Sequence, residues 1–410
     1  MRQALLEAHD LRGMRFAHAL SDRTDLWLQD LWNDAIGAWH GSGTVALVAL
    51  GGYGRGELAP FSDLDVMLVH DGQHDIDTLA HLLWYPLWDA KVKLGHSVCT
   101  ESQALQRAKD DIESATALLS VRLIAGDAAL AESLAREGRS LWNAQAKKRL
   151  PELMARVRER QQMHGEVAFL LEPNLKEGYG GLRDIHALEW AQCAGVDISR
   201  SDTSSLDSGR DVLMNVRVAL HRLRGRADEI VRLEDQDALA EMCGYPSADT
   251  LMASLSSAAR TVAWVGDEVW ARIESSRRTS SRDRALAPGV VIHGGEVTLE
   301  DTIDPSEDPT LVLRVATAAA RQRVRIHRQT LDRLAQLSPS MPSPWPAGAV
   351  DDLVGLLLSG HDAIPILEAL DQRGLWVKVL PEWAPNRARP QRNAYHRYTV
   401  DRHLWEAAAR

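Results

Sequence analysis

The chain has 410 residues, a hydrophobic fraction of 45%, a charged fraction of 25% and a formal net charge of −10. These values are typical of a soluble globular protein with several domains, and the acidic balance argues against nucleic-acid binding, which requires a basic surface. The three cysteines, Cys99, Cys193 and Cys243, have no paired spacing, which favours a reducing cytoplasm over a disulfide framework or a zinc site. No apolar run is long enough to span a membrane, and residues 1–20 contain no signal-peptide core. We therefore expect a cytoplasmic protein that binds neither nucleic acid nor a membrane.

The first part of the chain alternates predicted helices and strands, a pattern that favours an α+β fold. Apolar residues recur at helical spacing in some segments and form short continuous runs in others. The predicted helices are 1–40, 76–90, 112–124 and 128–146, and the predicted strands are 44–49, 66–69 and 91–100. We expect residues 1–145 to form one compact domain.

Strand signals nearly vanish after residue 150, and long helical patterns follow. The predicted helices are 151–171, 181–194, 211–229 and 247–275, with a polar loop at 201–208. The later elements are an exposed linker at 277–282, a β piece at 289–299 with a Gly294-Gly295 turn, helices at 309–325, 329–337, 351–359 and 363–373, and a proline-rich boundary at 338–346. We expect a helical domain at 146–280, a linker region at 281–346 and the start of a further domain at 347–410.

The segment 50–65 carries two carboxylates behind a glycine-rich turn. It lies between two apolar runs, so we expect a strand, a turn and a second strand that opens with Asp63 and Asp65. Residues two apart on a strand point to the same face, which brings the two carboxylates together. Their mutual repulsion is relieved by a divalent hard cation such as Mg²⁺. The pair therefore predicts a magnesium site.

The turn itself has the composition of a phosphate-binding loop. Gly51 and Gly52, with two further glycines, let the backbone approach an anion closely. We expect Arg55 either to neutralise phosphate or to brace the loop, Ser62 to offer its hydroxyl to a phosphate oxygen, and Glu57 to serve either structure or catalysis. A phosphate cradle beside metal-binding carboxylates indicates nucleotidyl transfer, whereas the alternative is a plain hairpin turn with solvated aspartates.

A second informative segment is 172–185, which reads E-P-N-L-K-E-G-Y-G-G-L-R-D-I. Three glycines within four positions cannot lie inside a helix, although helical patterns flank them. We expect a shaped loop that ends at a helix N-terminus, with Lys176 and Arg183 available to anions. The alternative is an interdomain turn with solvated charges.

Together these two segments resemble the bifunctional PII uridylyltransferase/uridylyl-removing enzymes, the GlnD family. Residues 50–65 are similar to the nucleotidyltransferase signature, and residues 176–185 are similar to the family's K-x-G-x-G-G-L-R-D-I element, of which a related form occurs in glutamine synthetase adenylyltransferases. The likeness continues through 288–289, 381–383 and 395–403, the last of which is similar to the opening of the family's HD hydrolase domain. The resemblance implies a nucleotidyltransferase-fold mixed-sheet domain followed by a mostly helical domain.

The resemblance also implies roles for individual residues. Gly51 and Gly52 would shape the nucleotide loop, Asp63 and Asp65 would be catalytic and bind Mg²⁺, and His403 would be the first histidine of the HD metal site. Arg55, Ser62, Lys176 and Arg183 complete the set of nucleotide-binding residues that we expect.

The sequence departs from the family pattern in the first domain. Many nucleotidyltransferases place a third carboxylate on a later strand, but residues 93–99 contain none. Asp89 or Glu101 could assist in its place. Cys99 stands where the family pattern predicts an arginine, which puts phosphate binding at that position in doubt.

The C-terminal part departs from the pattern as well. No His-Asp doublet follows His403, and the doublet His361-Asp362 precedes it, in the wrong order for that metal site. We therefore expect a fragment that lacks most of the HD domain and the ACT domains, and that does not remove uridylyl groups.

The resemblance implies Mg²⁺-dependent transfer of UMP from UTP to a tyrosine of the PII nitrogen regulatory protein, with release of pyrophosphate. One alternative is adenylyl transfer from ATP to PII or to glutamine synthetase, since no motif here identifies the base. Another is a non-catalytic nucleotide sensor that keeps only the fold.

Overall fold

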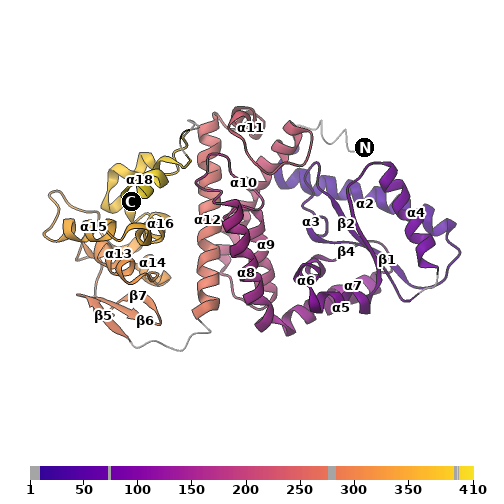
Figure 1. Cartoon of the computed structure of the whole chain (residues 1–410), viewed down its shortest axis with the longest axis horizontal. Coiled ribbons are helices and arrows are strands. Elements are labelled where there is room, and N and C mark those ends of the chain that lie inside the picture. Colours follow the sequence, from indigo (N-terminus) through magenta and orange to yellow (C-terminus); the bar gives the residue numbers. More distant parts are fainter. Residues whose placement is uncertain (1–9, 73–74, 276–282, 392–394, 396) are drawn as a thin grey trace. The chain divides into compact units, whose positions relative to one another are not determined.

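The computed structural model describes residues 10–72, 75–275, 283–391, 395 and 397–410 (Figure 1). The predicted linker at 277–282 and the first residues of the predicted helix 1–40 lie outside this part of the chain. The predicted α+β class is confirmed. The chain divides into two compact units, Met1–Gly165 with Asn174–Leu251, and Glu166–Pro173 with Met252–Arg410. The four predicted domains stay predictions, and each unit is described by itself.

A mixed four-stranded sheet is the centre of the first unit. Its strands are β1 (Val45–Ala49), β2 (Leu64–His70), β3 (Leu94–Thr100) and β4 (Arg122–Gly126). They lie in the order β3-β2-β1-β4, with β2 and β3 parallel and the other pairs antiparallel. Every residue of β1 is buried because this central strand has helices over both faces, and an uninterrupted apolar run is the sequence of such a strand.

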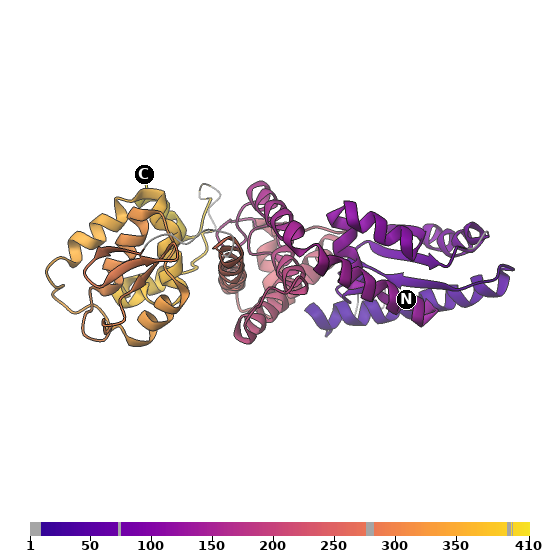
Figure 2. The same ribbon diagram turned by 90° about the horizontal axis from the view of Figure 1, so that it is seen from below.

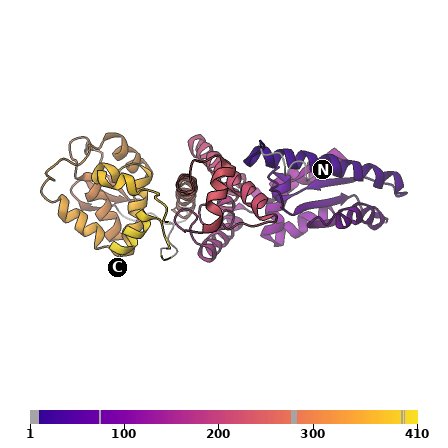
Figure 3. The ribbon, with the colours of Figure 1, turned by 90° about the horizontal axis from the view of Figure 1, so that it is seen from above.

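Helices cover both faces of this sheet (Figures 2 and 3). Helices α2 (Gly13–Ala38) and α4 (Ile76–Asp89) share one apolar core with the strands, and α7 (Ala128–Ala144) packs on β1 and β4 from the other side. Helix α5 (Glu101–Asp110) packs beside α7 and begins with a capping box between Thr100 and Gln103. The helix predicted at 76–90 and the strands predicted at 44–49 and 91–100 are confirmed.

The helix predicted at 112–124 is wrong in its second half. Helix α6 (Ile112–Ala117) and the 3₁₀ turn η1 (Leu118–Ser120) are followed by strand β4. Ile124 is the one buried residue of β4, so the pattern of this segment does not show the strand. Backbone pairing with β1, far away in the sequence, determines it. Helix α5 was not predicted either.

Five helices and one 3₁₀ turn complete this unit or begin within it. They are α8 (Ala146–His164), α9 (Leu182–Cys193), α10 (Arg200–Arg224), η2 (Leu233–Asp235), α11 (Gln236–Cys243) and α12 (Ala248–Ser275). The loop predicted at 201–208 is wrong, because these residues form the first turns of α10. Ser199 caps that helix by accepting from the amide of Asp202, and Ser205 and Ser208 donate to carbonyls four residues earlier.

The second unit combines a small antiparallel sheet with helices. Its elements are β5 (Arg284–Ala287), β6 (Val290–His293), β7 (Glu296–Leu299), α13 (Leu311–Gln322), α14 (Arg328–Leu337), α15 (Ala349–Leu357), η3 (Gly360–Ala363), α16 (Ile364–Gln372), α17 (Trp376–Val379), η4 (Pro381–Asn386) and α18 (Val400–Ala408). The predicted Gly294-Gly295 turn joins β6 to β7, and both glycines have positive φ, which other residues rarely adopt.

A buried arginine ties the C-terminal helix into this unit. Arg260 of α12 is almost fully buried and donates to Glu368, Asp371 and Asp401 at 2.5–3.1 Å. Asp401 of α18 also accepts from the amide of Ala388. These charges are paired and hydrogen-bonded, as buried charges must be.

Within the described residues, no single helix has the length and apolar composition to cross a membrane; α15 together with Gly360–Gln372 passes that test only as a pair bent by 115°.

Candidate nucleotide-binding site

A cavity of about 660 Å³ in the first unit brings together the two informative sequence segments. It is lined by all eight residues predicted to bind nucleotide or metal in this unit: Gly51, Gly52, Arg55, Ser62, Asp63, Asp65, Lys176 and Arg183. The two segments are more than a hundred residues apart, so folding has placed them on one surface. Their individual roles stay predictions.

The glycine-rich turn is one turn of helix, α3 (Gly51–Gly54), between β1 and β2. Gly51 has φ +55°, a conformation that glycine adopts without strain. At Gly54 a side chain would collide with the carbonyl oxygen of Ser120, so this glycine is needed for packing. Its amide bonds the carbonyl of Leu50, and the amide of Gly56 bonds that of Tyr53. Only Gly51 and Gly52 of the four glycines line the cavity.

Asp65 lies between two glycines that make room for its carboxylate. It is on β2 and pairs with Gly95 on β3. A methyl group on Gly95 would collide with Asp65 Oδ1, and one on Gly51 would lie 3.1 Å from Oδ2. The strand neighbour at the level of Asp65 is therefore a residue without a side chain.

Asp63 precedes β2, and its side chain is 62% exposed. Burial, and then the charge of Asp63, raise the pKa of Asp65, while Lys176, Arg183 and Arg55 oppose that rise. Two hard oxygen donors that line one cavity fit Mg²⁺, because this ion is commonly held by one or two carboxylates together with substrate phosphates.

Neither residue suggested as a third carboxylate lines the cavity. Glu101 accepts a hydrogen bond from Ser133 Oγ at 2.8 Å, and Asp89 is exposed at the end of α4. Among the residues that the structure describes, no three or more His, Cys, Asp and Glu side chains are grouped so that they could hold a metal ion. A metal at Asp63 and Asp65 would thus complete its coordination with water or with oxygens of the nucleotide.

The loop that carries Lys176 and Arg183 is clamped from both sides. Asn174 Oδ1 accepts from the amides of Lys176 and Glu177 at 3.1 and 2.8 Å. Buried Asp184 accepts from the amide of Gly180 at 2.6 Å, from Gln161 at 3.2 Å and from Arg160. The aspartate of the K-x-G-x-G-G-L-R-D-I element therefore holds the loop in shape and belongs to its structure.

The shaped loop directs two cations to the cavity. The side chains of Lys176 and Arg183 are 32% and 40% exposed, and both lie beside Glu177 at 3.9 and 3.5 Å. Burial lowers the pKa of Lys176, and the charges of Arg217 and Arg183 lower it further. Several cations so close together repel one another, so an anion bound between them is favoured.

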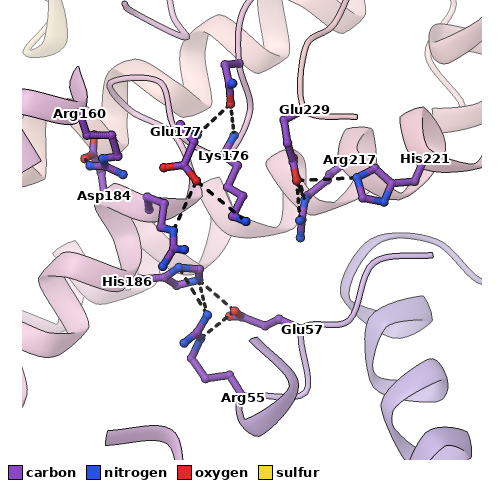
Figure 4. Close-up of polar contacts among 12 residues, drawn as sticks. Arg55, Glu57, Arg160, Lys176, Glu177, Asp184, His186, Arg217, His221 and Glu229 are labelled. Atoms are coloured by element: carbon purple, nitrogen blue, oxygen red, sulfur yellow. Dashed lines mark hydrogen bonds and ion pairs between the residues drawn. The ribbon is translucent and has the colours of Figure 1, made fainter. Parts of the chain in front are cut away.

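Sequence reasoning missed a buried cluster that joins the two segments (Figure 4). His186 on α9 has its Nε2 2.9 Å from Glu57 Oε2, and Arg55 Nε lies 2.8 Å from the same oxygen. Arg210 Nε approaches the other oxygen of Glu57 at 3.7 Å. Helical spacing was the available signal, because His186 lies three residues after Arg183 and therefore on the same face of α9.

A second missed pair is Arg217 with Glu229, which also lines the cavity (Figure 4). Arg217 donates to both carboxylate oxygens of Glu229 at 2.6–3.0 Å. Burial by itself would raise the pKa of Glu229, but His221, whose Nε2 lies 3.8 Å from Oε1, and the charge and hydrogen bonds of Arg217 outweigh it and lower the pKa to about 2. Arg217 and Glu229 line the cavity together with Lys176 and lie close enough for their charges to affect its pKa.

None of the remaining predicted positions is among the residues that line the cavity. Cys99 is fully buried in β3, and burial raises the pKa of its thiol. His403 is exposed on α18 in the second unit. In the doublet upstream of it, His361 Nε2 lies 3.3 Å from Glu406, and Asp362 pairs with Arg323 at 2.7 Å.

The chain is similar to known proteins along nearly its whole length. Residues 148–270 match the family model described as GlnD PII-uridylyltransferase. The bifunctional uridylyltransferase/uridylyl-removing enzyme of Streptomyces coelicolor is 43% identical over 413 aligned residues, which cover 96% of this chain and 49% of that protein. The enzymes of the same name from Mycobacterium tuberculosis and Corynebacterium glutamicum are 40% and 30% identical, covering 94% and 89% of this chain and 50% and 53% of those proteins. The chain thus spans about half the length of the curated relatives it matches.

Proposed function

This chain belongs to the GlnD PII-uridylyltransferase family, and we propose that it transfers UMP from UTP to a tyrosine of the PII nitrogen regulatory protein. The observation that carries the proposal is the cavity in the first unit. In it the carboxylates of Asp63, just before β2, and Asp65, on β2, line one space with the cations of the second segment. A nucleoside triphosphate needs both, because its phosphates require positive charge and its metal requires carboxylates.

The reaction assigns a task to each group. The tyrosine oxygen attacks the α-phosphorus, the bond from that phosphorus to the oxygen bridging to the β-phosphate breaks, and pyrophosphate leaves. One of the carboxylates of Asp63 and Asp65 accepts the tyrosine proton. Lys176 and Arg183 stabilise the charge that develops on the departing pyrophosphate. Asp63 and Asp65 would hold Mg²⁺, which would supply Lewis-acid stabilisation of the charge on the phosphates.

The partners follow from this proposal. They are PII and UTP in the cytoplasm, with no nucleic acid and no membrane. The proposal includes a role in regulating nitrogen metabolism. It is supported by the family model, which names PII, and by the relatives, which are named uridylyltransferase/uridylyl-removing enzymes.

A substrate matrix tests the proposal. The purified chain is incubated with Mg²⁺ and either α-labelled UTP or α-labelled ATP, and with either PII or glutamine synthetase. We expect label on PII with UTP only. Label from ATP on either protein would favour adenylyl transfer, and nucleotide binding without label on any protein would favour a nucleotide sensor.

A further inference from the structure

One buried contact joins the glycine-rich segment to helix α9. His186 Nε2 lies 2.9 Å from Glu57 Oε2, although 129 residues separate the two in the sequence. Both side chains are only 7% exposed. Both side chains are thus largely shielded from solvent, and Glu57 Oε2 also accepts from Arg55 Nε at 2.8 Å.

The protonation state of the His186 ring determines which of its nitrogens donates a hydrogen bond and which accepts one. Burial, and then the charge of Arg55, lower the pKa of His186 to about 4, so the ring is neutral at pH 7. A neutral imidazole has one donor nitrogen and one acceptor nitrogen. The tautomer that donates from Nε2 to Glu57 leaves Nδ1 to accept from Arg55 Nη2, which lies 3.5 Å away.

Arg55 is thereby held on two sides. Its Nε donates to Glu57 Oε2 at 2.8 Å, and its Nη2 lies 3.3 and 3.5 Å from the two ring nitrogens of His186. Its side chain still lines the cavity and is 18% exposed. An arginine fixed in advance loses less rotamer freedom when it binds an anion than a mobile one does.

We infer that His186 is a positioning residue, which fixes Arg55 through Glu57 in the orientation that binds the triphosphate. This inference rests on the proposed function, because it requires a nucleotide in the cavity. It also assigns Glu57 a structural task, one of the two that its sequence position left open. The contact between His186 and Glu57 thus links helix α9 to the glycine-rich segment. Through it, α9 determines the orientation of Arg55, the residue that follows α3.

The first test compares two substitutions of His186. His186→Leu removes both ring nitrogens, and we expect the Kd of UTP with Mg²⁺, measured by titration calorimetry, to rise by about tenfold, the loss typical of one charge-assisted hydrogen bond. KM for UTP should rise by a similar factor while kcat changes less. His186→Gln keeps a donor near Nε2 and should restore the Kd to within about threefold of wild type. His70→Leu, which removes another buried histidine of this unit outside the cavity, is the matched control and should leave the Kd unchanged.

The second test asks whether His186 acts through Arg55. Arg55→Gln should weaken UTP binding, and adding His186→Leu should weaken it no further. If the Kd of the double variant instead rises by the product of the two single increases, the substitutions act independently and the inference is wrong. If His186→Leu fails to fold, the same cycle with Glu57→Gln, which keeps the side-chain size, replaces it.

Failure of the inference can be told apart from failure of the proposed function. If wild-type protein binds UTP and labels PII but the two substitutions act independently, only the positioning role is wrong. If wild-type protein binds no UTP, the proposed function and the positioning role are both wrong.

Discussion

Asp65 occupies a space that exists only because its neighbours are glycines. A side chain on Gly95 would collide with Oδ1, and Gly51 lies against Oδ2. Gly95 itself is on β3, an edge strand of the sheet, at an exposed position. A methyl group there would therefore disturb the carboxylate without opening the core.

We predict that Gly95→Ala lowers the rate of UMP transfer strongly, because misplacing a reacting group by about 1 Å can cost about a hundredfold. The melting temperature should change little. Steady-state labelling of PII measures the rate, and Ser97→Ala on the same strand is the control. A Gly95→Ala protein with the wild-type rate would show that Asp65 need not stay where it lies.

The carboxylate pair itself has a stricter prediction. Asp63→Asn and Asp65→Asn keep the side-chain shape but remove the charge that Mg²⁺ requires, so each should lower kcat by at least about a hundredfold. Asp89→Asn should leave kcat unchanged, since Asp89 does not line the cavity. Loss of activity in Asp89→Asn would instead identify it as the third carboxylate.

At the scale of elements, the contact of α9 with the loop after α3 depends on pH. An unfolded histidine protonates near its ordinary pKa, whereas burial and Arg55 lower the pKa of His186 to about 4. Glu57 opposes this effect, and Arg183 adds to it. Below pH 6.5 the unfolded chain therefore binds a proton that the folded chain does not, and folding stability falls as the pH falls.

We predict that the lowered pKa of His186 reduces the free energy of unfolding by roughly 3 kcal/mol as the pH falls from about 6.5 to 4. His186→Gln lacks the titrating ring, so the stability of wild-type protein relative to this variant should decline over that range. Urea denaturation at several pH values measures the difference. A difference that stays constant with pH would mean that His186 is already protonated in the folded protein.

Elements could be predicted from the sequence where neighbouring residues carry a recognisable pattern. The apolar run of β1, the glycines of 50–65 and the K-x-G-x-G-G-L-R-D-I element each carry their own pattern. Strand β4 could not be predicted, because its half-exposed residues show no clear period and its partner β1 is distant in the sequence. The start of α10 was misread because its serines and aspartates are typical of loops, while the cap at Ser199 and the burial of Leu206 make it helical.

The site could be predicted only in part, for the same reason. Asp63, Asp65, Lys176 and Arg183 stand in recognisable motifs, and the structure gathers them around one cavity. Helical spacing from Arg183 could indicate His186, but nothing in the sequence pairs it with Glu57, which lies 129 residues away. Only a three-dimensional structure reveals such a pair.

At the scale of the whole molecule, the cavity belongs to the first unit, whereas the buried network of Arg260 belongs to the second. Asp401→Ala would leave Arg260 without one of its carboxylates and the amide of Ala388 without its acceptor. We predict a loss of about 3–5 kcal/mol in unfolding free energy, the usual cost of breaking a buried ion pair.

The Kd of UTP should stay unchanged in Asp401→Ala, since every residue that lines the cavity lies in the other unit. Chemical denaturation and titration calorimetry on the same preparation measure both quantities. A weakened Kd would show that the second unit contributes to nucleotide binding.

The central claim is that this chain places a nucleotide on a protein through the cavity of its first unit. The most direct measurement is the intact mass of PII after incubation with the chain, Mg²⁺ and UTP. We predict that PII gains the mass of one uridylyl group per chain, and that Asp63→Asn and Asp65→Asn prevent the gain. Unchanged PII in the presence of bound UTP, or full modification by both variants, would contradict it.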